Sequence, residues 1–268
     1  MLVCLLLYHA ANPAPFNKHE GKEGVRCTSP FLQTCVQVAH ADQKRAGMEV
    51  GRFSVDANPF RDDLACNNSM YAAFRDGKLV WVNQPEHPVD PLAEFVHDSL
   101  RALVLNHKFS CVGAKAAFRS GNYRFGLYST MTSPQATAGL AHDLWLFVQE
   151  QASFNSDFTT FVASFQEPVA ADELAWERLL WAQLQCLHAL DRRYHTWDAA
   201  VSADPNASNF SFSVAGRAFF VVGLHPASSR WTRRFAWPTL VFNAHHQFEH
   251  LRVQGTFERM RDVIRTRE

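Results

Sequence analysis

The sequence predicts an α+β fold, in which a largely antiparallel sheet is flanked by helices. One observation is a strong helical period in residues 171–195, where apolar residues recur at steps of three and four. A second is a hairpin pattern, in which two strand-like runs lie on either side of a turn at Ala215 and Gly216. The third is the mixed order of helices, strands and hairpins along the chain. That order favours an α+β fold over a doubly wound parallel sheet.

The individual elements are predicted from local signals. Residues 77–85 follow a turn and predict a strand, and residues 91–105 predict a helix that begins at Pro91. A short helix is expected over residues 110–121, ending at Gly121. We then expect a strand, a helix, a strand, the helix with the strongest period, the hairpin, a further strand and a terminal helix, at residues 122–130, 139–154, 158–168, 171–195, 209–226, 238–243 and from about 256 onward.

The composition fits a folded chain with a core of substantial size. Of its 268 residues, 47% are hydrophobic and 19% are charged. Residues 1–52 show no sustained period and predict an irregular N-terminal extension, so residues 53–268 are assigned to a single α+β domain. The 26 basic residues balance 26 acidic ones, and a net charge of zero argues against a nucleic-acid partner.

The expected location is the cytoplasm. No apolar run approaches the roughly 20 residues that a membrane-spanning helix needs. The six cysteines form no CxxC pair and are spread over the chain, as is typical of reduced thiols in cytoplasmic proteins. We therefore expect no membrane partner, while the oligomeric state stays open.

The segment from Gly223 to Arg252 is dense in histidine, arginine and aromatic residues, and it allows three interpretations. In the first, His246, Glu249 and His250 form the H-x-x-E-H pattern of a zinc hydrolase, with two histidines one helical turn apart and a glutamate as base. In the second, the histidines only cap backbone groups or lie exposed.

The third interpretation is a heme site. Protoheme needs an axial donor, an apolar slot and cations for its two propionates. His225 follows a buried-strand pattern, and Pro226 restricts the backbone just after it. Ser229 and three guanidiniums follow within a few residues and suit the propionates, while Phe242 suits the wall of the slot. The guanidiniums are those of Arg230, Arg233 and Arg234.

Three blocks of the chain resemble the YqcI/YcgG family. The longest, "FSFSVAGRAFFVVGLHPASSRWTRRFAWPTLVFNAHHQFEHLR" at residues 210–252, is similar to the C-terminal signature of that family. Two further blocks are "FSCVGAKAAFRSGNYRFGLY" at residues 109–128 and "LHALDRRYHTWDAAVSADP" at residues 187–205. The resemblance spans roughly residues 53–268.

The resemblance implies a heme-dependent enzyme, because the family includes N-hydroxylases that act on guanidine or amine nitrogens of arginine-like small molecules. Heme b would then be the cofactor, with an electron donor or peroxide as a second partner. A non-catalytic heme-binding sensor is the alternative.

The resemblance also places family histidines at His225 and His245. We expect His225 to be the axial iron ligand and His245 to be a catalytic group that faces the same cavity. His245 and Cys111 are rival ligands, because a second imidazole or a thiolate can also bind heme iron. A cationic substrate needs a carboxylate, for which the candidates are Asp191, Asp198 and Asp204.

Overall fold

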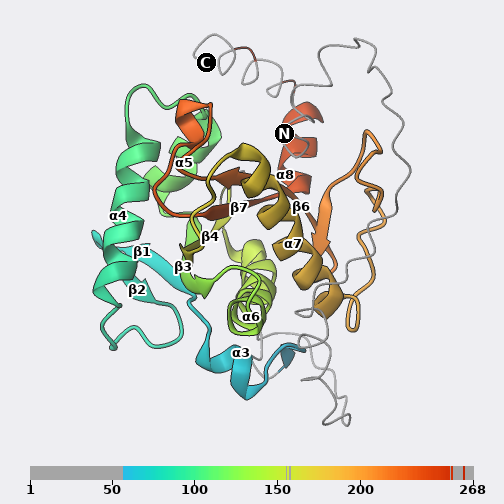
Figure 1. The fold of residues 1–268 in the computed structure, drawn as a ribbon, viewed down its shortest axis with the longest axis horizontal. Helices are drawn as coiled ribbons and strands as arrows, with labels where there is room; N and C mark the ends of the chain where they lie inside the picture. The colour runs from blue at the N-terminus through green and yellow to red at the C-terminus, as the bar shows by residue number, and fades with distance from the viewer. Residues whose placement is uncertain (1–56, 155, 157, 254, 256–261, 263–268) are drawn as a thin grey trace.

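The computed structural model describes residues 57–154, 156, 158–253, 255 and 262, and in these ranges a seven-stranded sheet carries helices on both faces (Figure 1). The predicted extension at residues 1–52 and the helix expected from about 256 lie outside the described residues. Among the described residues, no helix is long and apolar enough to cross a membrane. The helices are α3 (Asp63–Asn67), α4 (Pro91–Leu105), α5 (Val112–Ser120), α6 (Pro134–Glu150), α7 (Glu173–Asp191) and α8 (His245–Val253).

The sheet has the strand order β2-β1-β3-β4-β7-β6-β5, and every neighbouring pair is antiparallel except β3 with β4. The helix α6 connects these two parallel strands. The predicted α+β class with a largely antiparallel sheet is therefore confirmed. The strands are β1 (Ala72–Arg75), β2 (Lys78–Trp81), β3 (Tyr123–Thr130), β4 (Thr160–Glu167), β5 (Phe212–Val214), β6 (Arg217–Leu224) and β7 (Thr239–Ala244).

Local capping explains where the helices begin and end. The Asp90 carboxylate accepts a hydrogen bond from Leu92 N at the start of α4, and Pro91 follows it as predicted. Gly121 ends α5 with φ of 69°, a conformation that glycine adopts without strain. The helix α6 begins five residues before the predicted position, because Ser133 caps it through Ala136 N and Pro134 starts it.

Two apolar cores lie on opposite faces of the sheet. One packs α6 and α7 against β4, β6 and β7, and it includes Leu140, Leu180, Phe161 and Phe242. The other packs α4 and α5 against β3 and its neighbours. Each core removes large side chains from water, which is the main stabilising contribution to such a fold.

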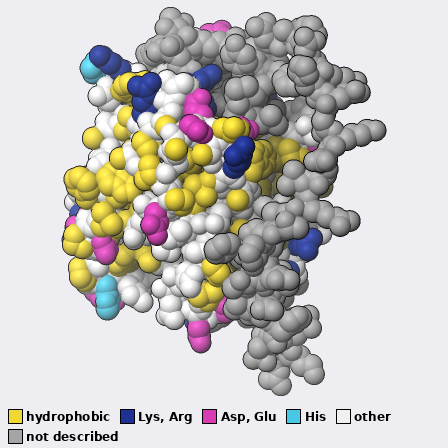
Figure 2. All heavy atoms as spheres, in the orientation of Figure 1, with side chains coloured by type: hydrophobic (Ala, Val, Ile, Leu, Met, Phe, Trp, Pro, Cys, Tyr) yellow, Lys and Arg dark blue, Asp and Glu magenta, His cyan; other side chains and the backbone are white. Residues whose placement is uncertain are grey.

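Not every apolar side chain of α4 is covered. Leu92 is 41% exposed and Phe95 is 61% exposed. Figure 2 shows hydrophobic side chains gathered on this side of the molecule, over the region of α4. The Phe95 ring meets Trp237 edge-on with a centroid distance of 5.8 Å, so the apolar surface extends to the segment before β7.

A buried polar chain connects α4 with β3. Arg101 donates to the Tyr123 hydroxyl at 3.1 Å, and this hydroxyl lies 2.7 Å from His97 Nε2. The other ring nitrogen of His97 lies 3.0 Å from Asp98 Oδ1. The His97 side chain is fully buried, and burial is the main cause that lowers its pKa to about 4. A neutral imidazole with its proton on Nδ1 satisfies every contact in the chain.

We expect stability to fall when the pH is lowered from 7 to 4. In the unfolded chain His97 takes up a proton near pH 6.5, whereas in the folded protein it does so only near pH 4. The unfolded state therefore binds more protons in this window, which costs roughly 3 kcal/mol of unfolding free energy by pH 4. Urea unfolding at both pH values measures the loss, and His97→Gln should lack this part of it. An equal pH dependence in both proteins would contradict the assignment.

Candidate functional site

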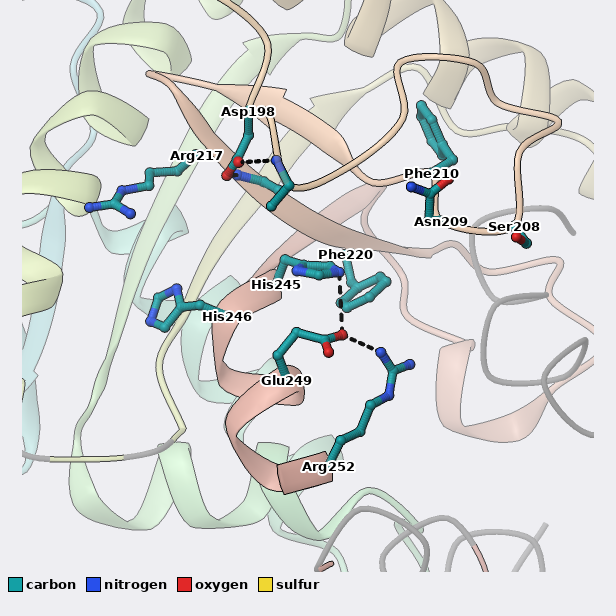
Figure 3. Close-up of a pocket in the computed structure, with 12 residues that line it drawn as sticks. Asp198, Ser208, Asn209, Phe210, Arg217, Phe220, His245, His246, Glu249 and Arg252 are labelled. Atoms are coloured by element: carbon teal, nitrogen blue, oxygen red, sulfur yellow. Dashed lines mark hydrogen bonds and ion pairs between the residues drawn. The ribbon is translucent and has the colours of Figure 1, made fainter. Parts of the chain in front are cut away.

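A pocket of about 650 Å³ lies at the edge of the sheet where β6 begins and β7 ends (Figure 3). Its walls come from three parts of the chain: the segment before β5, the first residues of β6, and α8. The lining residues are Asp198, Ala200, Ser208, Asn209, Phe210, Arg217, Ala218, Phe220, His245, His246, Glu249 and Arg252. This volume lies within the range of small-molecule and cofactor sites.

The sheet register brings α8 to the pocket. Ala244 at the end of β7 pairs with Phe219, so α8 begins beside the first residues of β6. The rings of Phe220 and His245 are 4.8 Å apart between centroids. Gln247 accepts from Thr159 N at 3.1 Å and donates to Thr159 O at 3.0 Å. This paired contact fixes α8 to the chain just before β4, which explains the glutamine of the signature structurally.

His245 is a mostly buried imidazole at the pocket wall. Its Nε2 atom lies 3.6 Å from Glu249 Oε1, and Glu249 also pairs with Arg252. Burial is the main cause that lowers the pKa of His245, although the Glu249 charge acts in the opposite direction. Burial and the Arg217 charge likewise lower the pKa of His246. Neutral imidazoles retain a lone pair that can bind a metal.

Asp198 is held rigidly at another side of the pocket. Its Oδ1 atom accepts from Ala200 N at 3.0 Å, and its Oδ2 atom accepts from Ala218 N at 2.9 Å. Its own backbone N–H donates to Ser213 Oγ at 3.0 Å. The carboxylate is thus anchored to its own loop and to β6 at once.

The other two candidate acids have structural contacts. Asp191 is buried and accepts from Ala215 N and from the His195 ring, which ties the end of α7 to the hairpin turn. Asp204 lies in an exposed turn that it closes through Asn206 N. Of the three predicted carboxylates, Asp198 is the one that lines the pocket.

His225 lies just beyond the end of β6 and is 3% exposed. Its ring stacks on Trp176 of α7, with centroids 5.2 Å apart and 19° between the planes. Its backbone N–H donates to Arg233 O at 3.0 Å. The Nδ1 atom is buried and has no hydrogen-bonding partner within the described part of the chain. Burial lowers the pKa of His225, against the opposing effect of Glu173.

The two predicted histidines lie at opposite ends of the β6–β7 pair. Leu224, next to His225, pairs with Thr239, whereas Phe219 pairs with Ala244, next to His245. Five residues of strand separate these two pairs, or about 17 Å. The expectation that His225 and His245 face one cavity is therefore wrong. Both follow similar strand patterns, but β6 and β7 run antiparallel, so their last residues lie at opposite edges of the sheet.

The chain matches the family model of the YqcI/YcgG family over residues 100–268, which is more than half of its length. It belongs to the YqcI/YcgG family. No curated protein and no solved structure matches the chain. The matched region contains every residue that lines the pocket. Two of the blocks that resemble this family, residues 187–205 and 210–252, meet there.

The remaining predicted residues of the YqcI/YcgG signature lie around His225 rather than at the pocket. Ser229 donates its N–H and its hydroxyl to Glu173 Oε1, both at 2.8 Å. Arg234 donates to Ser228 O and Ser229 O, so its guanidinium stabilises the loop that follows β6. Arg230 is exposed and Arg233 is half-buried beside the short turn of 3-10 helix η3 (Trp231–Arg233).

Phe242 and Cys111 also have local partners. Phe242 is fully buried in the core between Phe161 and Phe219, and it pairs with Val221, four residues before His225. It therefore fills the core and does not wall a slot beside His225. Cys111 caps α5, because its sulfur accepts from Ala114 N at 3.4 Å.

The side chains of the H-x-x-E-H pattern do not gather as a zinc site. The described residues hold no group of three or more His, Cys, Asp or Glu side chains that could bind a metal ion. Glu249 contacts His245 and Arg252, while His246 is exposed at the rim and His250 does not line the pocket.

Sequence reasoning placed His245 and Asp198 among the candidates but missed the pocket residues Phe210, Arg217, Phe220 and Arg252. All four lie in the long signature block at residues 210–252. The block indicates which part of the chain contributes to the pocket. No local sequence pattern shows which of its residues line the same cavity.

Proposed function

We propose that this member of the YqcI/YcgG family is a heme-dependent enzyme that hydroxylates a guanidine or amine nitrogen of an arginine-like small molecule, and that the pocket beside His245 is its reaction chamber. The observation that carries the proposal is a neutral, mostly buried imidazole that lines a cavity of ligand size. The family resemblance supplies the class of chemistry.

The lining residues fit the chemical needs of heme b. His245 would be the iron ligand, and its lowered pKa keeps the donor lone pair available at neutral pH. Phe210 and Phe220 offer apolar surface to the macrocycle. Arg217 would hold a propionate, for which guanidinium is a well-suited partner. Bound heme would supply the activation of dioxygen, with an electron donor, or of peroxide.

This proposal moves the iron ligand from His225 to His245. In favour of His225 are its buried, unpartnered Nδ1 atom and the rigid backbone that Pro226 imposes after it. Against it, the ring is packed face to face on Trp176, and His225 is not among the residues that line the pocket. An axial ligand needs a ring nitrogen that faces open space for the macrocycle. That requirement favours His245.

Hemin titration of the purified protein tests the proposal. We expect one heme per chain with a strong Soret band, and a product one oxygen atom heavier when L-arginine, oxygen and a reductant are added. Absorbance gives the stoichiometry, and mass spectrometry identifies the product. Heme binding without turnover of any guanidine or amine would favour the sensor alternative. Stoichiometric zinc without a Soret band would overturn the proposal and favour the hydrolase.

A further inference from the structure

We propose that Asp198 determines which substrates this enzyme accepts, by binding a positively charged nitrogen group inside the pocket. The inference rests on the proposed function, because it assigns the substrate to the same cavity. It goes further in naming the residue that selects the charge of the substrate.

The first argument is the unused hydrogen-bonding capacity of Asp198. A carboxylate has about four lone-pair positions. Backbone N–H groups of Ala200 and Ala218 take one position on each oxygen. Each of the two oxygens therefore keeps one position for a ligand, and the two positions together match the fork of a guanidinium or the hydrogens of an ammonium.

The second argument is the charge of the surroundings. No Lys or Arg side chain forms an ion pair with Asp198 within the described residues, although the side chain is only partly exposed. The other acid of the pocket differs, because Glu249 already pairs with Arg252 and lies beside His245. A partly buried carboxylate without a counterion is costly, and a cationic ligand would relieve that cost.

The third argument is the composition of the rest of the cavity. Phe210 and Phe220 line it, and aromatic faces attract organic cations as well as apolar groups. Arg217 also lines the pocket and forms no ion pair with the described residues, so a cationic group meets repulsion at that wall and attraction at Asp198. The pocket therefore offers a carboxylate for a cation, and a guanidinium for an anion comes from a neighbouring lining residue.

Rigidity makes Asp198 selective rather than merely attractive. Its two carboxylate oxygens are held by different segments, the loop itself and β6, and its N–H is held by Ser213. A fixed carboxylate loses little conformational entropy when it binds a ligand. It also cannot reorient toward water when the ligand is neutral. A neutral analogue would leave the charge unpaired, which is how a binding site rejects it.

The test compares three probes of similar shape on the heme-reconstituted protein. L-arginine and agmatine carry a guanidinium, whereas L-citrulline carries a neutral ureido group. We expect the wild type to bind the two cations at least about tenfold more tightly than citrulline. In Asp198→Asn this preference should disappear through weaker binding of the two cations, while the Soret band recorded before any probe is added stays unchanged. Soret shifts and calorimetry measure the affinities.

The matched control is Asp204→Asn, which removes an acid from the same loop without touching the pocket. It should keep the preference of the wild type. An unchanged preference in Asp198→Asn would overturn the inference. Should Asp198→Asn fail to fold, the wild type still decides, because equal binding of citrulline and arginine would also overturn it. If hemin does not bind but arginine binding to the heme-free protein depends on Asp198, the proposed function fails and the inference stands.

Discussion

Replacing His245 with alanine is expected to remove heme from the protein. Of the two imidazoles among the described residues that line the pocket, His245 is the mostly buried one, and its ring lies beside Phe220. Loss of residues that merely orient a ligand weakens metal binding by about 10- to 100-fold, so loss of the ligand itself should cost at least about a hundredfold in hemin affinity. The Soret band should therefore be absent at stoichiometric hemin, and added imidazole should restore part of it.

Three controls separate this assignment from its rivals. His246→Ala changes the neighbouring, exposed imidazole and should keep the Soret band. His225→Ala should also keep it, with a lower melting temperature because the ring packs on Trp176. Cys111→Ala should leave the spectrum unchanged. If His225→Ala abolishes the band while His245→Ala retains it, the iron ligand is His225 and the pocket is not the heme site.

Asp143→Ala is expected to be the most destabilising of the substitutions considered for the fold. Asp143 is fully buried and accepts hydrogen bonds from Met70 N, from the Ser69 and Tyr128 hydroxyls and from the His142 ring. Alanine would leave these donors without their acceptor in a dry environment. Breaking such a buried, charged network costs about 3–5 kcal/mol of unfolding free energy.

Urea unfolding of the heme-free protein measures the effect of Asp143→Ala. Tyr128→Phe deletes a single donor of the same network and should cost about 1–2 kcal/mol. Asp204→Ala, at an exposed turn, should stay within about 0.5 kcal/mol of the wild type. A loss below about 1 kcal/mol for Asp143→Ala would show that the network is satisfied by water instead.

Local signals predicted most elements of the fold correctly. The bounds of α4 follow from the apolar period and from Pro91, and the hairpin follows from a turn in which Ala215 and Gly216 both have positive φ, 53° and 69°. The start of α6 was predicted too late, because the prediction followed the apolar run from residue 139. The capping pair Ser133–Pro134 precedes that run. The helix α8 was missed because it begins at the residue directly after β7 and its nine residues are mostly polar.

The sequence by itself determined the α+β class, the hairpin, and the signature block that identifies the family and contains most residues of the pocket. Only the tertiary structure decided that His245 joins Asp198 in one cavity while His225 lies at the other end of the strands. The reason is that strand patterns report burial and not direction. Whether two strand ends meet depends on antiparallel register and on contacts such as that of Asp198 with Ala218, which form between residues distant in the chain.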